Sequence, residues 1–82
     1  MDETEYVERL AEEYRRLHLA MGALHLGLET GEGSLGHYDG DWCEIELEKL
    51  YLHLDALGAA RRVDEIEVAN NAILHRRKKL HA

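Results

Sequence analysis

Residues 7–28 read VERLAEEYRRLHLAMGALHLGL, and this stretch decides the fold class. Its apolar side chains recur at alternating steps of three and four, and we call these residues the seam: Val7, Leu10, Tyr14, Leu17, Met21, Leu24 and Leu28. Such spacing is typical of a helix that packs lengthwise against other helices. From Leu17 onward apolar residues surround the whole helix, so other elements must enclose that half. The stretch therefore predicts an all-α protein with a long first helix.

Start and stop signals divide the chain into three helices. The sequence contains no proline, so we expect glycines to end the helices and acidic caps to begin them. An Asp followed three residues later by Glu is typical of a capping box, and it occurs at Asp2, Asp41 and Asp64. We predict helices over residues 2–28, 41–57 and 64–80, with a glycine-rich loop over 29–40. The short connection after residue 58 requires the last two helices to form an antiparallel hairpin.

Within these helices the sequence predicts which residues pack inside. The second helix has one broad apolar face: Trp42, Ile45, Leu47, Leu50, Leu52, Leu54 and Leu57. The third helix has a sparser stripe: Ile66, Ala69, Ile73 and Leu80, with Val68 and Ala72 beside it. Asn70 or Asn71 near this stripe would need a hydrogen-bond partner. Gly22 costs helix stability, and we expect the first helix to bend there.

The predicted lengths indicate self-association. At 1.5 Å per residue the first helix spans roughly 40 Å and each hairpin helix roughly 25 Å, so about 15 Å of seam is left uncovered. A chain of 82 residues forms one domain near the lower size limit at which a single core suffices. We therefore expect a homodimer that completes the bundle, with the seam as its interface.

Composition narrows the classes of partner. The formal net charge of −7 argues against nucleic acid or anionic lipid as the general partner and favours a basic or apolar protein surface. The longest apolar run, residues 17–28, is shorter than the roughly 20 residues that a membrane-spanning helix needs. A single cysteine and an acidic N-terminal segment suit a reducing compartment without a signal peptide. We expect a cytoplasmic protein that does not contact membranes.

Histidines and a cysteine support an alternative hypothesis, a helical bundle that binds zinc or heme. His18, His25 and His53 each lie between leucines, and bundles build cofactor sites from inward side chains on facing helices. The loop adds four more groups that bind zinc: His37, Asp39, Asp41 and Cys43. His18 and His25 are about 10 Å apart along the helix axis, so one ion cannot bind both. The competing interpretation places these histidines neutral at the edge of the core, hydrogen-bonded to a carboxylate or carbonyl.

A second alternative is nucleic-acid binding through the basic end of the third helix, which we define as Arg76, Arg77, Lys78 and Lys79. Such a run can contact phosphates. It is also explained by the negative end of the helix dipole, or by pairing with the acidic face around Glu44, Glu46 and Glu48. The net charge and the lack of an aromatic, Asn or Gln reader nearby favour these structural explanations.

Signals for enzymatic chemistry are weak. Residues 31–36 spell G-x-G-x-x-G, but they follow a helix instead of a strand, which indicates a flexible loop and not a dinucleotide site. Ser34 and Cys43 are the only Ser or Cys, and neither has a histidine at a spacing that would fix a catalytic geometry. The sequence therefore favours a non-enzymatic interaction module, a self-associating regulatory, adaptor or inhibitor protein that acts through an apolar helix face.

Overall fold

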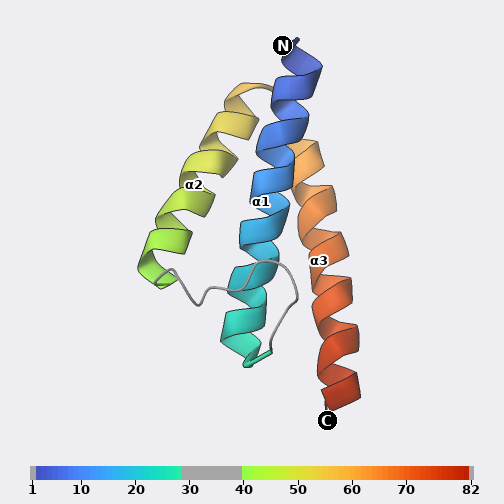
Figure 1. Ribbon diagram of the computed structural model, residues 1–82. Coiled ribbons are helices and arrows are strands. Elements are labelled where there is room, and N and C mark those ends of the chain that lie inside the picture. The colour runs from blue at the N-terminus through green and yellow to red at the C-terminus, as the bar shows by residue number, and fades with distance from the viewer. Residues whose placement is uncertain (1, 29–39, 82) are drawn as a thin grey trace.

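The computed structural model describes residues 2–28 and 40–81, which form three helices. These are α1 (Glu3–Leu26), α2 (Gly40–Ala56) and α3 (Ala60–His81). α1 packs against both other helices, whereas α2 and α3, joined as an antiparallel hairpin, contact each other far less (Figure 1). No strand occurs in the described ranges. The predicted all-α fold with three helices and a hairpin is confirmed, while the predicted loop over 29–40 lies outside the described residues apart from Gly40, the first residue of α2.

The three predicted helix starts have different outcomes. Asp2 caps α1, and its side chain accepts a hydrogen bond from the backbone N–H of Glu5 at 2.9 Å. Asp41 and Asp64 are not caps, because α2 begins at Gly40 and α3 begins at Ala60. Helical bonds of α3 already start at the Ala59 carbonyl, which accepts from the N–H of residue 63 at 3.2 Å. Burial of Val63 in the core explains the early start, since that side chain is held in place only if the helix has begun.

Two glycines end helices by the same backbone motif. Gly27 (φ 69°) follows α1 and Gly58 (φ 78°) follows α2, and both adopt the left-handed conformation that glycine accepts without strain. The N–H of Leu28 donates to the carbonyl of Ala23, and the N–H of Ala59 donates to that of Leu54, each at 2.8 Å. These bonds define a Schellman motif at each site. The prediction for Gly58 is confirmed, whereas α1 ends before residue 28 because Gly27 terminates it.

The predicted surplus length of α1 is wrong. α1 has 24 residues and α3 has 22, which correspond to roughly 36 and 33 Å. The two lengths are nearly equal because α3 begins four residues earlier than predicted and runs through His81, but α3 is shifted along α1 and extends beyond its end (Figure 1). The apolar half of α1 is enclosed only in part, contrary to the expectation, because Leu24 and Leu26 are exposed. Its buried residues are Leu19, Ala20, Met21 and Ala23.

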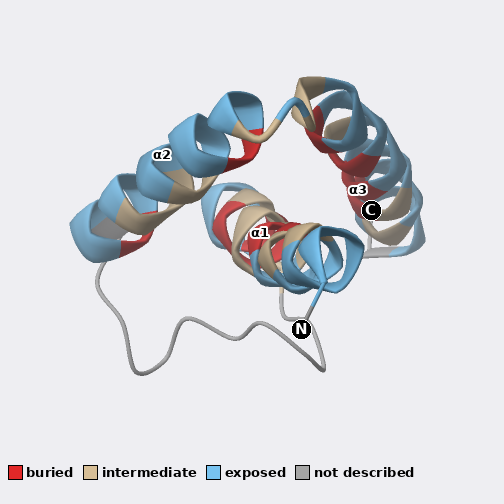
Figure 2. Cartoon of the chain, turned by 90° about the horizontal axis from the view of Figure 1, so that it is seen from above, coloured by how far each residue is buried: buried red, intermediate tan, exposed pale blue. Residues whose placement is uncertain are grey.

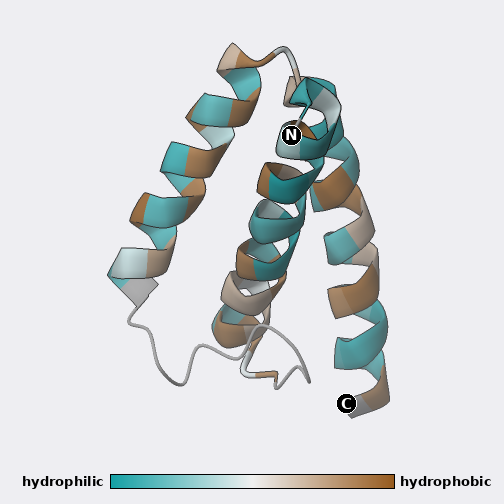
Figure 3. Ribbon diagram, turned by 45° about the horizontal axis from the view of Figure 1, so that its top comes forward, coloured by the Kyte–Doolittle hydropathy of each residue, from teal (hydrophilic) through white to brown (hydrophobic). Residues whose placement is uncertain are grey.

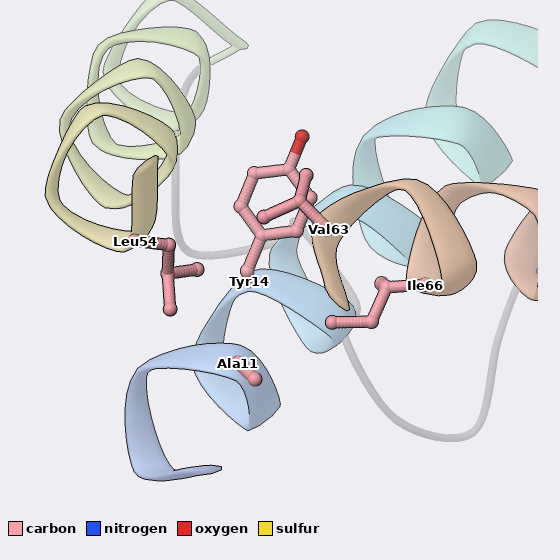
Figure 4. Packing of buried hydrophobic residues seen from close by; sticks show 5 residues of the cluster. All are labelled: Ala11, Tyr14, Leu54, Val63 and Ile66. Atoms are coloured by element: carbon pink, nitrogen blue, oxygen red, sulfur yellow. The ribbon is translucent and has the colours of Figure 1, made fainter. Parts of the chain in front are cut away.

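The core near the hairpin connection combines side chains from all three helices. Its buried members are Ala11, Tyr14, Leu54, Val63 and Ile66. Figure 4 shows the Tyr14 ring rising from α1 between Leu54 of α2 and Val63 of α3. The buried residues line the sides that the helices turn toward one another, and the outer sides are exposed (Figure 2). Burying an aliphatic side chain contributes roughly 1.5–3 kcal/mol, so this cluster holds the hairpin onto α1.

A second cluster joins the other ends of α1 and α3 and consists of Leu19, Ala23 and Leu74, with Leu28 and Ile73 packed against it. α1 continues through Gly22 as one helix. An ideal Cβ at Gly22 would overlap the Cδ1 atom of Leu74, so glycine here permits a close approach of the two helices.

The apolar stripe of α3 is rotated from its predicted position. Ile66 is buried as expected, but the following buried positions are Asn70 and Leu74, while Ala69 and Leu80 are exposed. The rotation occurs because Leu74 packs against Gly22 and Asn70 bonds to the backbone of α1. Within the described ranges, no helix combines the length and hydropathy that crossing a bilayer requires.

Candidate interaction surface

Most of the seam is used inside the chain. Tyr14 and Met21 are buried in the folded chain, and Leu24 is 51% exposed. The remaining members are half-buried: Val7, Leu10, Leu17 and Leu28. The dimer interface along the seam stays a prediction, but α3 and α2 already cover much of this surface. Among the described residues, exposed large apolar side chains also occur on α2 and α3.

α2 carries apolar side chains on two sides. The side toward the other helices is buried or half-buried and contains Cys43, Leu47, Leu50 and Leu54. On the other side, Trp42, Ile45 and Leu52 have exposed fractions of 42%, 53% and 57%. We call these three residues the outer α2 face, since steps of three and seven keep them on one side of a helix. In Figure 3 brown and teal bands alternate along the visible side of α2, consistent with apolar residues on more than one side.

Sequence reasoning missed this division because it combined all seven apolar residues of the second helix into one broad face. The positions of these residues in the sequence already indicate two separate faces. At 100° per residue the centres of the two sets are about 160° apart, too far for one neighbour to cover both. The inner set faces α1, so the outer set remains on the surface.

Carboxylates flank the outer α2 face. Asp41, Glu44, Glu48 and Asp55 are exposed. The first three follow one another at steps of three and four, which places them in a single row along the helix. We call these three residues, together with Asp55, the acidic stripe. None of the four forms an ion pair within the described part of the chain, whereas Glu46 on the opposite flank pairs with Lys49 at 3.5 Å. α2 therefore presents an apolar surface that also carries Lys49, between Ile45 and Leu52, and that has a negative border on one flank.

The outer side of α3 has an apolar half and a basic half. Val68 is 71% exposed, and with the exposed Ala69 and Ala72 it forms a surface of small side chains. A shallow hollow lies there, lined by Arg61, Asp64, Glu65, Val68 and Ala69. In the basic end that follows, Arg77 is half-buried and the other three cations are exposed. None of them is ion-paired within 2–28 and 40–81, so the suggested pairing with the acidic face of α2 does not form there.

A buried polar network joins α1 to α3. The Tyr14 hydroxyl donates to a Glu67 carboxylate oxygen at 2.7 Å. Asn70, 1% exposed, donates through Nδ2 to the Arg15 carbonyl and to Nδ1 of His18, both at 3.0 Å. The Tyr14 and His18 rings stack with centroids 5.8 Å apart. The predicted need of an asparagine for a partner is confirmed at Asn70, and this network sets the register of the two helices.

The network also determines the protonation states of Tyr14 and His18. Burial, together with the hydrogen bond to Glu67, raises the pKa of the Tyr14 phenol well above its usual range. Burial lowers the pKa of His18, and the Glu67 carboxylate partly opposes this lowering. Because an amide nitrogen can only donate, Nδ1 of His18 accepts from Asn70, and the neutral ring carries its proton on Nε2. These groups are arranged to hold helices together.

The histidines proposed as metal ligands lie at separate places. His18 belongs to the α1–α3 network, His25 is exposed near the end of α1, and His53 of α2 bonds to the Tyr6 hydroxyl at 3.1 Å. Cys43 is buried. In the described part of the chain, no three His, Cys, Asp or Glu side chains form a group that could hold a metal ion. The remaining predicted ligands, His37 and Asp39, lie outside the described residues, as does the G-x-G-x-x-G segment. The zinc or heme hypothesis stays a prediction.

Comparisons with known protein families, with curated protein sequences and with solved structures find no match. The function is therefore argued from the geometry and chemistry of this chain.

Proposed function

We propose that the protein is a small non-enzymatic interaction module that self-associates through the outer α2 face. The observation that carries this proposal is the exposure of Ile45 and Leu52, at 53% and 57%, on a helix whose opposite side already packs in the core. Apolar side chains scattered singly over a surface are ordinary, but a row on one helix face is typical of helix-in-groove recognition. A tryptophan at one end of the row adds a residue type that is enriched in interface centres.

The free energy of burying apolar side chains also favours self-association. Covering a large aliphatic side chain contributes roughly 1.5–3 kcal/mol when it is fully removed from water, so Ile45 and Leu52 together stabilise a contact substantially. An apolar centre with a charged border is the usual anatomy of a reversible protein interface. For a chain of 82 residues with a small core, association also raises the apparent stability of the fold.

Sedimentation equilibrium over a wide concentration range tests the proposal. We expect the wild type to show a mass above that of the monomer in the micromolar range. The double variant Ile45→Glu/Leu52→Glu should remain monomeric, because it introduces two charges into the contact. Circular dichroism should show an unchanged helix content, since both side chains are exposed.

A matched control separates this face from the seam. Leu24→Glu/Leu26→Glu adds the same two charges at exposed positions of α1, where the side chains are 51% and 41% exposed. We expect this variant to associate like the wild type. Loss of association in the α1 variant and not in the α2 variant would assign the interface to the end of α1 that includes the seam residue Leu24. A folded wild type that stays monomeric at all concentrations would rule out self-association.

A further inference from the structure

We propose that the outer α2 face docks on the outer side of α3 in a second copy of the chain, with the acidic stripe against the basic end. This inference depends on the proposed self-association and deepens it by naming the partner surface. Both surfaces are exposed, and neither the four carboxylates nor the four cations form an ion pair within the described ranges. The chain thus carries two charged surfaces of opposite sign, each beside an apolar patch.

The acidic stripe argues against a contact of α2 with α2. In an antiparallel pair related by a two-fold axis, the same flank of each helix meets, so Glu44 and Glu48 of one copy would face the carboxylates of the other. In a parallel pair the stripe would face the flank that carries Glu46 and Lys49, whose ion pair leaves no net positive charge there. Like charges placed opposite each other in an interface cost several kcal/mol. A basic helix surface is therefore the complementary partner.

The outer side of α3 provides such a surface. Val68, Ala72, Arg76 and Lys79 follow at steps of four, four and three, so they share one side of the helix. The shallow hollow beside Val68 and Ala69 is also lined by Arg61, Asp64 and Glu65, so the positive part of this side is the later one, around Arg76 and Lys79. The charge of that later part is complementary to the acidic stripe.

The charged positions on the two surfaces have comparable spacing. From Glu44 to Glu48 there are four residues and from Arg76 to Lys79 three, or roughly 5–6 Å along each helix axis. The hairpin runs α2 and α3 antiparallel, so the start of α2 and the basic end of α3 both lie away from the connection at Gly58, and α3 extends farther than α2 (Figure 1). A two-fold axis that places the acidic stripe of one copy beside the basic end of the other forms this contact twice and closes the dimer.

Charge exchange between the two surfaces tests this arrangement. We design an acid-reversed variant, Glu44→Lys/Glu48→Lys, and a base-reversed variant, Arg76→Glu/Lys79→Glu. All four positions are exposed and lie within helices, so the fold should be retained, which circular dichroism checks. Each variant alone should associate at least tenfold more weakly than the wild type in sedimentation equilibrium at low salt. An equimolar mixture should recover association, because each surface then finds an opposite charge. The combined quadruple variant should likewise self-associate.

The salt dependence of association, compared between the wild type and uncharged variants, gives a second test of the docking. Wild-type association should weaken as salt is raised, and Glu44→Gln/Glu48→Gln should reduce that dependence without adding repulsion. If a charge-reversed variant fails to fold, these glutamine variants still test the docking. Association of the wild type that neither reversal weakens, or a mixture that stays monomeric, would overturn this docking while leaving self-association through α2 intact. A monomeric wild type would refute the proposed function itself. Binding of an added DNA duplex that Arg76→Gln/Lys79→Gln abolishes, with dimerisation unchanged, would assign the basic end to nucleic acid instead.

Discussion

A methyl group added at Gly22 tests how closely α1 and α3 approach each other. An ideal Cβ there would overlap Cδ1 of Leu74, a core residue that is 4% exposed. In a helix interior, replacing Gly by Ala stabilises by about 1 kcal/mol. Here the methyl must displace Leu74, and overpacking a core costs roughly 1–3 kcal/mol. With the middle of that range, Gly22→Ala should destabilise the protein by about 1 kcal/mol.

The effect of Gly22→Ala on stability should change sign when Cδ1 of Leu74, the obstructing atom, is removed. Leu74→Val deletes the Cδ1 atom and by itself costs about 1 kcal/mol for the lost methylene and the space left behind. In this background Gly22→Ala keeps only its helix-propensity gain, so it should stabilise by up to about 1 kcal/mol. A double-mutant cycle therefore predicts a coupling between Gly22 and Leu74 of about 2 kcal/mol.

Urea unfolding followed by circular dichroism measures all four proteins. One low protein concentration must be used throughout, since self-association would make the apparent stability depend on concentration. A shift of 1 kcal/mol changes the melting temperature of a domain this size by about 4–8 °C, so thermal scans provide an independent check. Equal stabilisation by Gly22→Ala in both backgrounds would refute the close approach of α1 and α3.

Three further predictions concern the α1–α3 network and the hairpin turn. Asn70→Ala removes the donor to the Arg15 carbonyl and to His18 and should destabilise by about 1–3 kcal/mol, whereas Asn71→Ala, at an exposed site, should change stability by less than about 0.5 kcal/mol in urea unfolding. Because burial lowers the pKa of His18 below its ordinary 6.5, its contribution to stability is fully present above pH 6.5 and is lost as the pH falls through the lowered folded value. The stability difference between wild type and His18→Gln should therefore change across this window, and a constant difference would contradict it. Gly58→Ala forces a side chain into φ 78° and should cost about 1 kcal/mol by thermal unfolding, although no atom obstructs the new Cβ.

The three-helix architecture was predictable because it follows from local patterns. Apolar periodicity identified α1, and Gly58 marked the end of α2 from its position after the last apolar residue. The start of α3 was not predictable from the Asp-x-x-Glu signal at Asp64. A capping pattern indicates where a helix can begin, but burial of Val63 made an earlier start more favourable.

The candidate interaction surface was only partly predictable. The sequence indicated an apolar face for self-association, but it assigned that face to the seam of α1. Assigning faces requires knowing which sides the neighbouring helices cover. α3 proved nearly as long as α1, and α2 turned out to have a second apolar side that includes Ile45 and Leu52.

By itself, the amino-acid sequence determined the presence of three helices, the glycine end of α2 and the separation of acidic from basic residues. These features depend on interactions between residues a few positions apart. Only the tertiary structure decided that Leu74 packs at Gly22, that Asn70 is buried against α1, and which side of α2 is exposed. The rotation of one helix against another depends on side-chain volumes and hydrogen bonds between residues more than 50 positions apart, and no local pattern encodes that fit.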